Sequence, residues 1–359
     1  MDLETQWRGG QNQALLLLKG LHARGHVPEL VAADGGALGP RAETSGIRVH
    51  YVSRAFFRLP AAWKVSELLR SGRFDVVHAN EAHAVTAVWM AMVRRAPDRV
   101  PLVVSRRVGY PIGKSPLARA RYNRAARIIA NSKWVAEQAA ASGAPREHLC
   151  VIHEGTEIPA RSSDAQRRAA RARWNMPHHA PLLGCVGALL PDKGQEWLIR
   201  ALPEIRKEFP GVRLLLAGDG PCREKLNTLA RELDVESAMI FAGFVSDVES
   251  VYAALDVFLL PSFFEALNNS LLAAMAHEIP SIAFNRGALR EIIEDGQSGL
   301  LVSGPNVTEI SGAVTRLLRE REFARHIAEG GRNRIEQNFS AEKMVDGMVR
   351  TYEEVLVNK

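Results

Sequence analysis

The sequence predicts an α/β protein built from two doubly wound parallel sheets. Short apolar segments alternate with amphipathic helical segments along the whole chain, which is the pattern of parallel strands covered by helices. A chain of 359 residues with 47% hydrophobic and 24% charged residues is long enough for two separate cores. The alternation starts again after an arginine-rich helical connector at 162–174, so we expect one sheet on each side of it.

The strands of the first sheet are expected in the front half of the chain. The helices between them have clear ends, since 12–24 stops at a glycine and 132–142 starts on a capping serine. The apolar runs of the first series are 27–33, 74–79, 102–105, 127–130 and 149–152. The apolar runs of the second series are 182–186, 212–217, 239–242, 257–260, 281–284 and 299–302.

Composition argues against several classes of protein. No apolar run approaches the roughly 20 residues that span a bilayer, and the first ten residues lack the features of a signal peptide. Cys150, Cys185 and Cys222 lie far apart without neighbouring histidines, which argues against a disulfide framework and a zinc site. We therefore expect a cytoplasmic protein.

The segment 260–274, LPSFFEALNNSLLAA, combines a strand end, an acidic turn and a helix start. Glu265 lies in the turn, and Asn268, Asn269 and Ser270 lead into an apolar helix. The unpaired backbone N–H groups of this helix start face the space near the carboxylate, and such groups bind phosphate. The segment therefore predicts a phosphate site beside an acid.

This segment resembles the donor-site signature of the retaining, nucleotide-sugar-dependent glycosyltransferases of family four. Glu265 matches the first glutamate of that signature, which follows Pro-Ser. The second glutamate, which commonly holds the ribose of the nucleotide, is replaced here by Ala273. Other motifs follow in the family order across most of the chain.

The resemblance implies the GT-B architecture, in which two Rossmann-like, doubly wound domains face each other across a cleft. Residues 1–175 would form an acceptor-side domain, completed by a C-terminal helix at 341–359. Residues 176–340 would form the domain that binds the nucleotide-sugar donor.

The resemblance also implies which residues bind the donor. Lys193, in the motif GALLPDKGQ, matches the family lysine that contacts the pyrophosphate, whereas Ala188 replaces the arginine that often follows the glycine of this motif. A lysine at a helix start is also a common solvated residue, and a turn acid can simply cap a helix, so these structural interpretations stay open. The remaining expected donor-binding residues are Gly10, Gly187, Gly218, Phe244, Leu267, Asn268, Asn269, Ser270 and Glu291.

The expected catalytic residues are Glu265, Arg107 and His78. Glu265 would orient the donor sugar, and His78 ends the strand 74–79 as in the family. Arg106 and Arg107 follow the next strand, where many relatives carry a histidine. An arginine cannot act as a base but can bind phosphate or carboxylate in a bidentate way, which favours an anionic donor or acceptor. A histidine at a strand end is also often structural, and this alternative stays open.

The start of the chain departs from the family. There the glycine-rich loop, here WRGGQ, follows the central strand of the first sheet, but six residues precede Trp7. Either this strand is shortened to 2–5 or translation starts further upstream. A sheet without its central strand leaves the neighbouring strands unpaired, so we expect weak stability.

The front half of the chain is basic. The first 173 residues hold 27 Lys and Arg against 14 Asp and Glu, a net charge of +13, and the remainder holds 19 against 26, a net charge of −7. In 54–73, Phe56, Phe57 and Trp63 alternate with basic residues, a composition typical of interfacial membrane contacts, and 113–127 adds a basic helix. Both segments could equally be ordinary solvated surface. We expect peripheral contact with an anionic membrane at the inner face of the cytoplasmic membrane.

The sequence thus predicts a retaining glycosyltransferase that moves a hexose from a nucleotide sugar to a cell-envelope glycan or glycolipid, as in lipopolysaccharide biosynthesis. We expect no cofactor besides the nucleotide-sugar co-substrate, and no Asp-x-Asp motif suggests a metal site. The alternative, a nucleotide-sugar-binding protein with little or no transfer activity, is favoured by Ala188 and Ala273. An oxidoreductase would require a Gly-x-Gly-x-x-Gly signature after a strand, and no nucleic-acid-binding motif is present.

Overall fold

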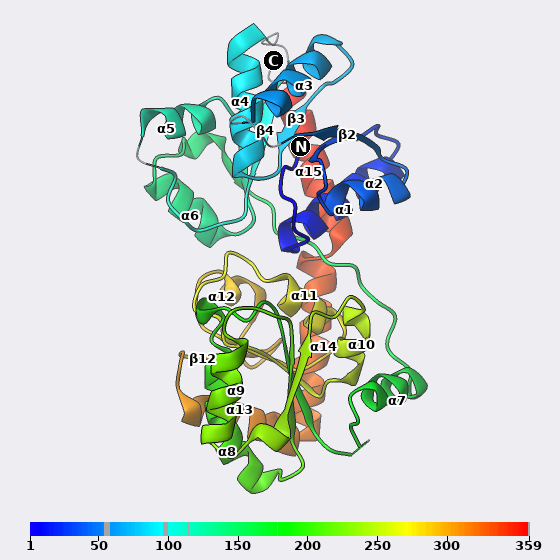
Figure 1. Cartoon of the computed structure of the whole chain (residues 1–359), viewed down its shortest axis with the longest axis vertical. Coiled ribbons are helices and arrows are strands. Elements are labelled where there is room, and N and C mark those ends of the chain that lie inside the picture. The colour runs from blue at the N-terminus through cyan, green and yellow to red at the C-terminus, as the bar shows by residue number, and fades with distance from the viewer. Residues whose placement is uncertain (54–57, 96–99, 114, 178, 358–359) are drawn as a thin grey trace. The chain divides into compact units, whose positions relative to one another are not determined.

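In the computed structural model, the chain folds into two compact units, each with parallel β-structure and surrounding helices (Figure 1). Unit 1 consists of Met1–Gly155 and Ser340–Lys359, and unit 2 is Thr156–Phe339. The structure describes residues 1–53, 58–95, 100–113, 115–177 and 179–357. Among these residues, no helix is long and apolar enough to cross a membrane. The three cysteines are free thiols, as their spacing predicts.

Unit 1 contains a two-stranded and a four-stranded parallel sheet. Its strands are β1 (Glu29–Ala33), β2 (Arg48–Val52), β3 (Val77–Ala79), β4 (Leu102–Arg106), β5 (Arg127–Ala130) and β6 (Leu149–Val151). β1 pairs with β2, and β3 to β6 pair in sequence order. The five expected strands are confirmed with ends shifted by a few residues. β2 was missed because it is an edge strand with only one buried residue, Val52, and therefore lacks a continuous apolar run.

The helices of unit 1 cover its sheets. They are α1 (Gly9–Ala23), α2 (Leu38–Thr44), α3 (Leu59–Arg70), α4 (Ala82–Arg95), α5 (Pro116–Asn123), α6 (Lys133–Ala141) and α15 (Ala341–Val357). The C-terminal helix α15 packs against α1 (Figure 1). A Cβ on Gly20 would lie 2.4 Å from a methyl carbon of Val345, so the glycine allows the two helices to approach closely.

The first residues of the chain lie between β1 and β3. The Asp2 N–H donates to Val31 O at 3.0 Å, and the Asn80 N–H donates to Met1 O at 2.9 Å. The Met1 ammonium group donates to His78 O at 2.7 Å. A shortened strand at 2–5 was one of the two alternatives that the sequence left open. In this described part of the chain the structure shows a single bridge, between Asp2 and Ala32, and no strand.

Unit 2 contains one six-stranded parallel sheet in the order β12-β11-β10-β7-β8-β9. Its strands are β7 (Leu182–Val186), β8 (Arg213–Ala217), β9 (Met239–Gly243), β10 (Val257–Leu260), β11 (Ser281–Phe284) and β12 (Leu300–Val302). All six confirm the expected positions. Along the central strand β10, Phe258 and Leu260 point into one core and Val257 and Leu259 into the other, so both faces of the sheet are covered.

The helices of unit 2 form the two covering layers. They are α7 (Asp164–Arg173), α8 (Gln195–Glu208), α9 (Arg223–Glu232), α10 (Val248–Ala254), α11 (Asn269–Ala276), α12 (Leu289–Ile292), α13 (Val307–Arg319) and α14 (Arg321–Asn338). The connector helix α7 starts on a capping box, in which the Ser163 side chain accepts from the Gln166 N–H and the Gln166 side chain accepts from the Ser163 N–H.

Helix α7 belongs to unit 2, whereas the expected domain boundary at 175 placed it with the front domain. The Arg171 side chain is 1% exposed and donates to Asp256 Oδ2 and Ala254 O, each at 3.0 Å. Arg167 binds the other carboxylate oxygen of Asp256 at 2.5 Å. These ion pairs hold the connector helix against the residue that precedes β10, and unit 2 accordingly begins at Thr156, before this helix.

We expect that Arg171→Ala lowers the free energy of unfolding by about 3 kcal/mol, because it removes a buried partner of Asp256 and leaves carbonyl oxygens without donors. Urea denaturation followed by circular dichroism measures this loss. Arg168→Ala, at an exposed position of the same helix, is the control and should change stability by less than about 0.5 kcal/mol. Equal effects of the two variants would contradict an anchoring role for Arg171.

Candidate functional site

The predicted residues of unit 2 gather at the carboxyl edge of its sheet. The strand order places the ends of β10, β7, β8 and β9 next to one another. In doubly wound sheets, ligands bind in the crevice outside the carboxyl ends of the strands. The loops that follow these four strands therefore form the candidate site.

The loops after β7 and β10 touch through their backbones. Gly194 has φ +68°, and a Cβ at this position would lie 2.1 Å from Pro261 O. The Phe263 N–H donates to Asp192 O at 2.9 Å, which joins the same two loops. Position 194 requires glycine for two reasons. Its backbone is left-handed, and there is no space for a Cβ atom next to Pro261 O.

This contact brings Lys193 and Glu265 together. Lys193 Nζ lies 2.8 Å from Glu265 Oε1, and the side chains are 24% and 7% exposed. Asn268 Nδ2 donates to the same oxygen at 2.9 Å, while Asn268 Oδ1 accepts the Leu271 N–H at 2.8 Å and so caps α11. The arrangement offers a cation, a carboxylate and a helix N-terminus within one small region.

The backbone of Glu265 is fixed from the other side by the loop after β11. The Ala288 N–H donates to Glu265 O at 3.1 Å. Gly287 has φ +53°, and a Cβ there would lie 2.4 Å from Glu265 O. The turn that carries the carboxylate is therefore held between two neighbouring loops, as a positioned functional group requires.

The ends of β7, β8 and β9 meet through glycines. A Cβ on Gly218, which has φ +150°, would lie 1.9 Å from Gly187 O. The Gly218 N–H donates to Gly243 O at 2.8 Å. The next residue, Phe244, has 75% of its surface exposed, so an aromatic ring faces solvent beside an open backbone.

The other predicted donor-binding residues lie partly in the core and partly in the helices α11 and α12. The Leu267 side chain is buried in the core, and Ala273 packs partly buried against the same core. Asn269 and Ser270 are the first two residues of α11, and Ser270 O accepts from the Tyr252 hydroxyl at 3.3 Å. Glu291 lies in α12. The roles of these residues stay predictions.

In unit 1, Arg107 lies within a polar network at the carboxyl edge of the sheet. Its Nε is 2.9 Å from Glu154 Oε1, and its Nη1 donates to both Asn80 O and Asn80 Oδ1 at 2.7 Å. Asn80 also contacts Gly10 O, so Gly10 and Arg107 belong to one cluster. The sequence interpretation missed Asn80 and Glu154 as partners, although both follow predicted strands. The guanidinium of Arg107 therefore already has a carboxylate partner and a carbonyl partner within the protein, in the absence of any bound anion.

Arg106 points away from this cluster. It is 6% exposed and donates to the Tyr122 hydroxyl at 3.2 Å and to Tyr110 O. The expectation that both arginines bind an anion therefore fails for Arg106, because successive residues along an extended chain point to opposite faces of the sheet.

His78 is half-buried, and both of its ring nitrogens have polar partners. Nδ1 lies 2.5 Å from the Tyr352 hydroxyl of α15, and Nε2 lies 2.8 Å from Ser105 Oγ. Burial, together with the positive N-terminus and Arg107, holds the pKa of His78 well below its ordinary value of 6.5. The ring is neutral at pH 7 and links α15 to β3 and β4. Its catalytic role stays a prediction.

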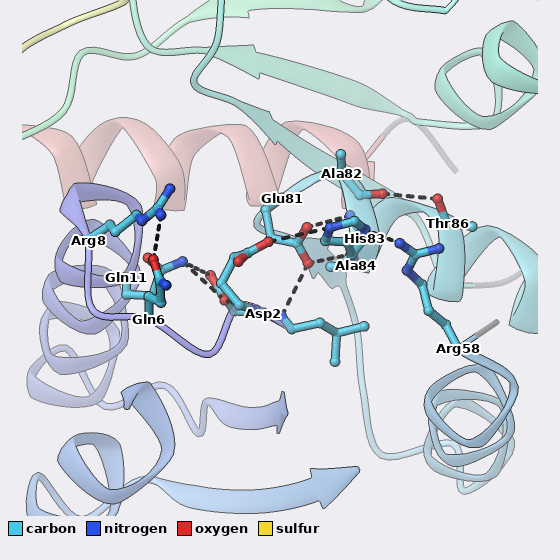
Figure 2. A network of polar contacts seen from close by, with 12 residues as sticks. Asp2, Gln6, Arg8, Gln11, Arg58, Glu81, Ala82, His83, Ala84 and Thr86 are labelled. Carbon is cyan, nitrogen blue, oxygen red and sulfur yellow. Dashed lines mark hydrogen bonds and ion pairs between the residues drawn. The ribbon is translucent and has the colours of Figure 1, made fainter. Parts of the chain in front are cut away.

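Glu81 is the centre of a second polar network in unit 1 (Figure 2). Its carboxylate accepts the backbone N–H groups of Leu3 at 3.2 Å, Ala84 at 2.6 Å and His83. Burial raises the pKa of Glu81 to about 7 despite these donors. Ligand atoms of Glu4, Glu81 and His83 lie within 4.8 Å of one another, as in a metal site. However, the guanidinium of Arg58 contacts His83 Nδ1, and a cation at this place disfavours a metal ion.

The amino-acid sequence matches known families over both units. Residues 180–320 match the family of glycosyl transferases group 1, and residues 8–155 match the glycosyl transferase 4-like domain. The chain belongs to the group 1 glycosyltransferases. This membership confirms the resemblance seen in the sequence.

Relatives of this glycosyltransferase include two curated enzymes. It is 26% identical over 301 residues to the lipopolysaccharide core biosynthesis glycosyltransferase LpsE of Rhizobium meliloti, covering 84% of this chain and 82% of that one. It is 29% identical over 279 residues to a GDP-mannose-dependent alpha-(1-6)-phosphatidylinositol monomannoside mannosyltransferase of Mycolicibacterium smegmatis, covering 70% and 72% of the two chains.

The crystal structure of Anabaena HepE in complex with UDP-glucose has the same fold. Its TM-score is 0.85 at 22% identity, and the match covers 98% of each chain. This likeness and the parallel sheets of both units confirm the GT-B class with two Rossmann-like domains.

The stability of this glycosyltransferase should fall as the pH rises from about 4.5 to about 7. Because the pKa of Glu81 is higher in the folded state than its ordinary value of 4.5, the folded state keeps the proton in this window. The resulting stability is complete below pH 4.5 and is lost as the pH passes the folded pKa, by up to about 3 kcal/mol.

Urea denaturation at pH 5 and pH 8 tests this expectation. Glu81→Gln should reduce the difference between the two free energies of unfolding, because an amide does not titrate. Glu137→Gln, on the exposed face of α6, is the control and should keep the wild-type difference. A Glu81→Gln variant with an unchanged pH dependence would contradict the raised pKa.

Proposed function

We propose that this glycosyltransferase is a retaining, metal-independent enzyme that moves a hexose from a nucleotide sugar to a glycan or glycolipid of the cell envelope. The cluster of Lys193, Glu265 and Asn268 at the start of α11 is the observation that carries the proposal. LpsE of Rhizobium meliloti acts in lipopolysaccharide core biosynthesis, and HepE of Anabaena binds UDP-glucose, which supports this class of substrates.

The cluster suits a diphosphate next to a sugar. A diphosphate is attracted by Lys193 and by the backbone N–H groups at the start of α11. When it binds Lys193, it competes with Glu265 for the ammonium group, and the carboxylate then accepts hydrogen bonds from sugar hydroxyls. These interactions stabilise the leaving group and orient the sugar ring.

The stereochemical outcome follows from the role of Glu265. A covalent glycosyl–enzyme scheme uses two carboxyl groups about 5 Å apart, one of which is a free nucleophile. Here one oxygen of Glu265 already accepts from both Lys193 and Asn268, which suits an orienting group better than a nucleophile. The acceptor hydroxyl would attack from the face of the departing phosphate, and that phosphate would take the hydroxyl proton. This route retains the anomeric configuration without a cofactor.

Product formation from labelled UDP-, GDP- and ADP-sugars with envelope glycolipids tests the proposal. The competing function is nucleotide-sugar binding without transfer, which the alanines at 188 and 273 favour. Binding of a nucleotide sugar without any product or hydrolysis across these acceptors would support that alternative instead.

Glu265→Gln should reduce kcat by about 100-fold or more while the protein stays folded, because the amide can no longer orient the sugar as an anion does. Steady-state kinetics measure the change, and circular dichroism checks the fold. Glu224→Gln, at an exposed position of α9, is the matched control and should keep full activity. Near-normal turnover of Glu265→Gln would remove this residue from the mechanism.

A glycolipid acceptor implies contact with the inner face of the cytoplasmic membrane, and we propose unit 1 for this contact. Its exposed apolar residues include Leu59, Trp63 and Leu117, of which 42%, 66% and 54% of the surface is accessible to solvent. Phe56 and Phe57 lie outside the described residues. Exposed apolar groups on a basic domain favour an anionic lipid surface.

Sedimentation with anionic vesicles should therefore show binding that weakens as salt is raised, since exposed charges are screened over about 8 Å at physiological ionic strength. The double variant with Trp63→Ala and Lys64→Glu should bind these vesicles more weakly than the wild type at the same salt concentration. Arg325→Glu, in an exposed ion-paired position of α14, is the control from unit 2. Equal binding to neutral and anionic vesicles would argue for an acceptor that is not membrane-bound.

A further inference from the structure

Arg223, the first residue of α9, places a cation beside the end of β9. Its Nη1 atom lies 3.6 Å from the position of a Cβ on Gly243, and its Nη2 atom donates to Phe241 O at 3.5 Å. The guanidinium also lies over the Phe241 ring, 5.9 Å from the ring centroid.

The polar contacts of the Arg223 guanidinium within the protein are made at long distances, 3.5 Å or more. Its nearest carboxylate is Asp219 at 3.8 Å, and the two side chains are 36% and 61% exposed. Two other cations of the same helix, Lys225 and Arg231, have carboxylate partners at 3.1 and 3.2 Å. An exposed pair at the longer distance contributes little, so a ligand can recruit this guanidinium at low cost.

The strand order suggests how a nucleotide sugar lies along the carboxyl edge. The strands follow one another as β10, β7, β8 and β9, and a nucleotide sugar is likewise linear, from sugar through diphosphate and ribose to base. The carboxylate of Glu265, after β10, suits sugar hydroxyls and repels phosphate. The exposed ring of Phe244, after β9, suits the flat face of a base. The base would therefore lie next to Arg223.

We infer that Arg223 contacts the base of the donor nucleotide and selects a base with a carbonyl acceptor, uracil or guanine, over adenine. This inference rests on the proposed function. A guanidinium carries only hydrogen-bond donors. Uracil and guanine offer it carbonyl oxygens, whereas adenine presents an amino group at the corresponding place, and two donors do not pair.

Titration calorimetry of the full chain with UDP, GDP and ADP tests the inference. Wild-type protein should bind UDP or GDP at least about tenfold more tightly than ADP. Arg223→Ala should weaken the preferred nucleotide about tenfold and leave ADP nearly unchanged, which removes the preference. Arg223→Lys keeps the charge but loses the planar donor fork, so it should also lose most of the preference. Arg231→Ala, the control on the same helix, should match the wild type in every titration.

The results separate the role of Arg223 from the proposed function. Equal weakening of UDP, GDP, ADP and inorganic pyrophosphate in Arg223→Ala would assign this residue to phosphate charge and overturn base selection. Unchanged affinities in this variant, or a wild-type preference for ADP, would overturn the inference while leaving the glycosyltransferase proposal intact. Failure of the wild type to bind any nucleotide or to transfer any sugar would overturn the proposed function, and this inference with it.

Discussion

The backbone contact between the loops after β7 and β10 is the constraint on which the candidate donor site depends. Gly194 lets the two loops approach until no side chain fits between them, and this approach places Lys193 2.8 Å from Glu265, although 72 residues separate them in the chain. Asn268 then uses one amide group for two tasks, capping α11 and holding the Glu265 carboxylate. The contacts of Gly194 and Asn268 therefore contribute both to the stability of the fold and to the geometry of the site.

Unit 1 uses the same edge of its sheets but satisfies its charges internally. Arg107 pairs with Glu154 and Asn80, and the Glu81 carboxylate accepts three backbone donors. A buried charge is costly unless it is paired and hydrogen-bonded, which explains why these groups have so many partners. An anion that binds Arg107 must compete with a carboxylate 2.9 Å away. This competition weakens the argument for an anionic acceptor that the basic sequence at this edge first suggested.

Two departures from the family pattern affect the same ligand. Ala188 stands where the family often has an arginine near the diphosphate, and Ala273 stands where it has a glutamate near the ribose. Under the proposed function, the nucleotide would therefore be held by fewer of the usual side chains. The helix N-terminus at α11, the Lys193 ammonium and the glycine-lined loops remain, and these are mainly backbone features. A site built on backbone groups tolerates side-chain replacement better than one built on paired charges, since backbone geometry is set by the fold.

The sequence by itself determined the features that depend on near neighbours. Eleven strands and the acidic turn at Glu265 were predicted from local apolar runs and turn residues, because these signals act within one or two turns of chain. The tertiary structure alone decided the rest. The edge strand β2 has no apolar run, α7 joins unit 2 through Arg171 and Asp256, and His78 meets Tyr352 across 274 residues. Such pairings depend on the order in which strands and helices pack, and a local pattern carries no information about that order.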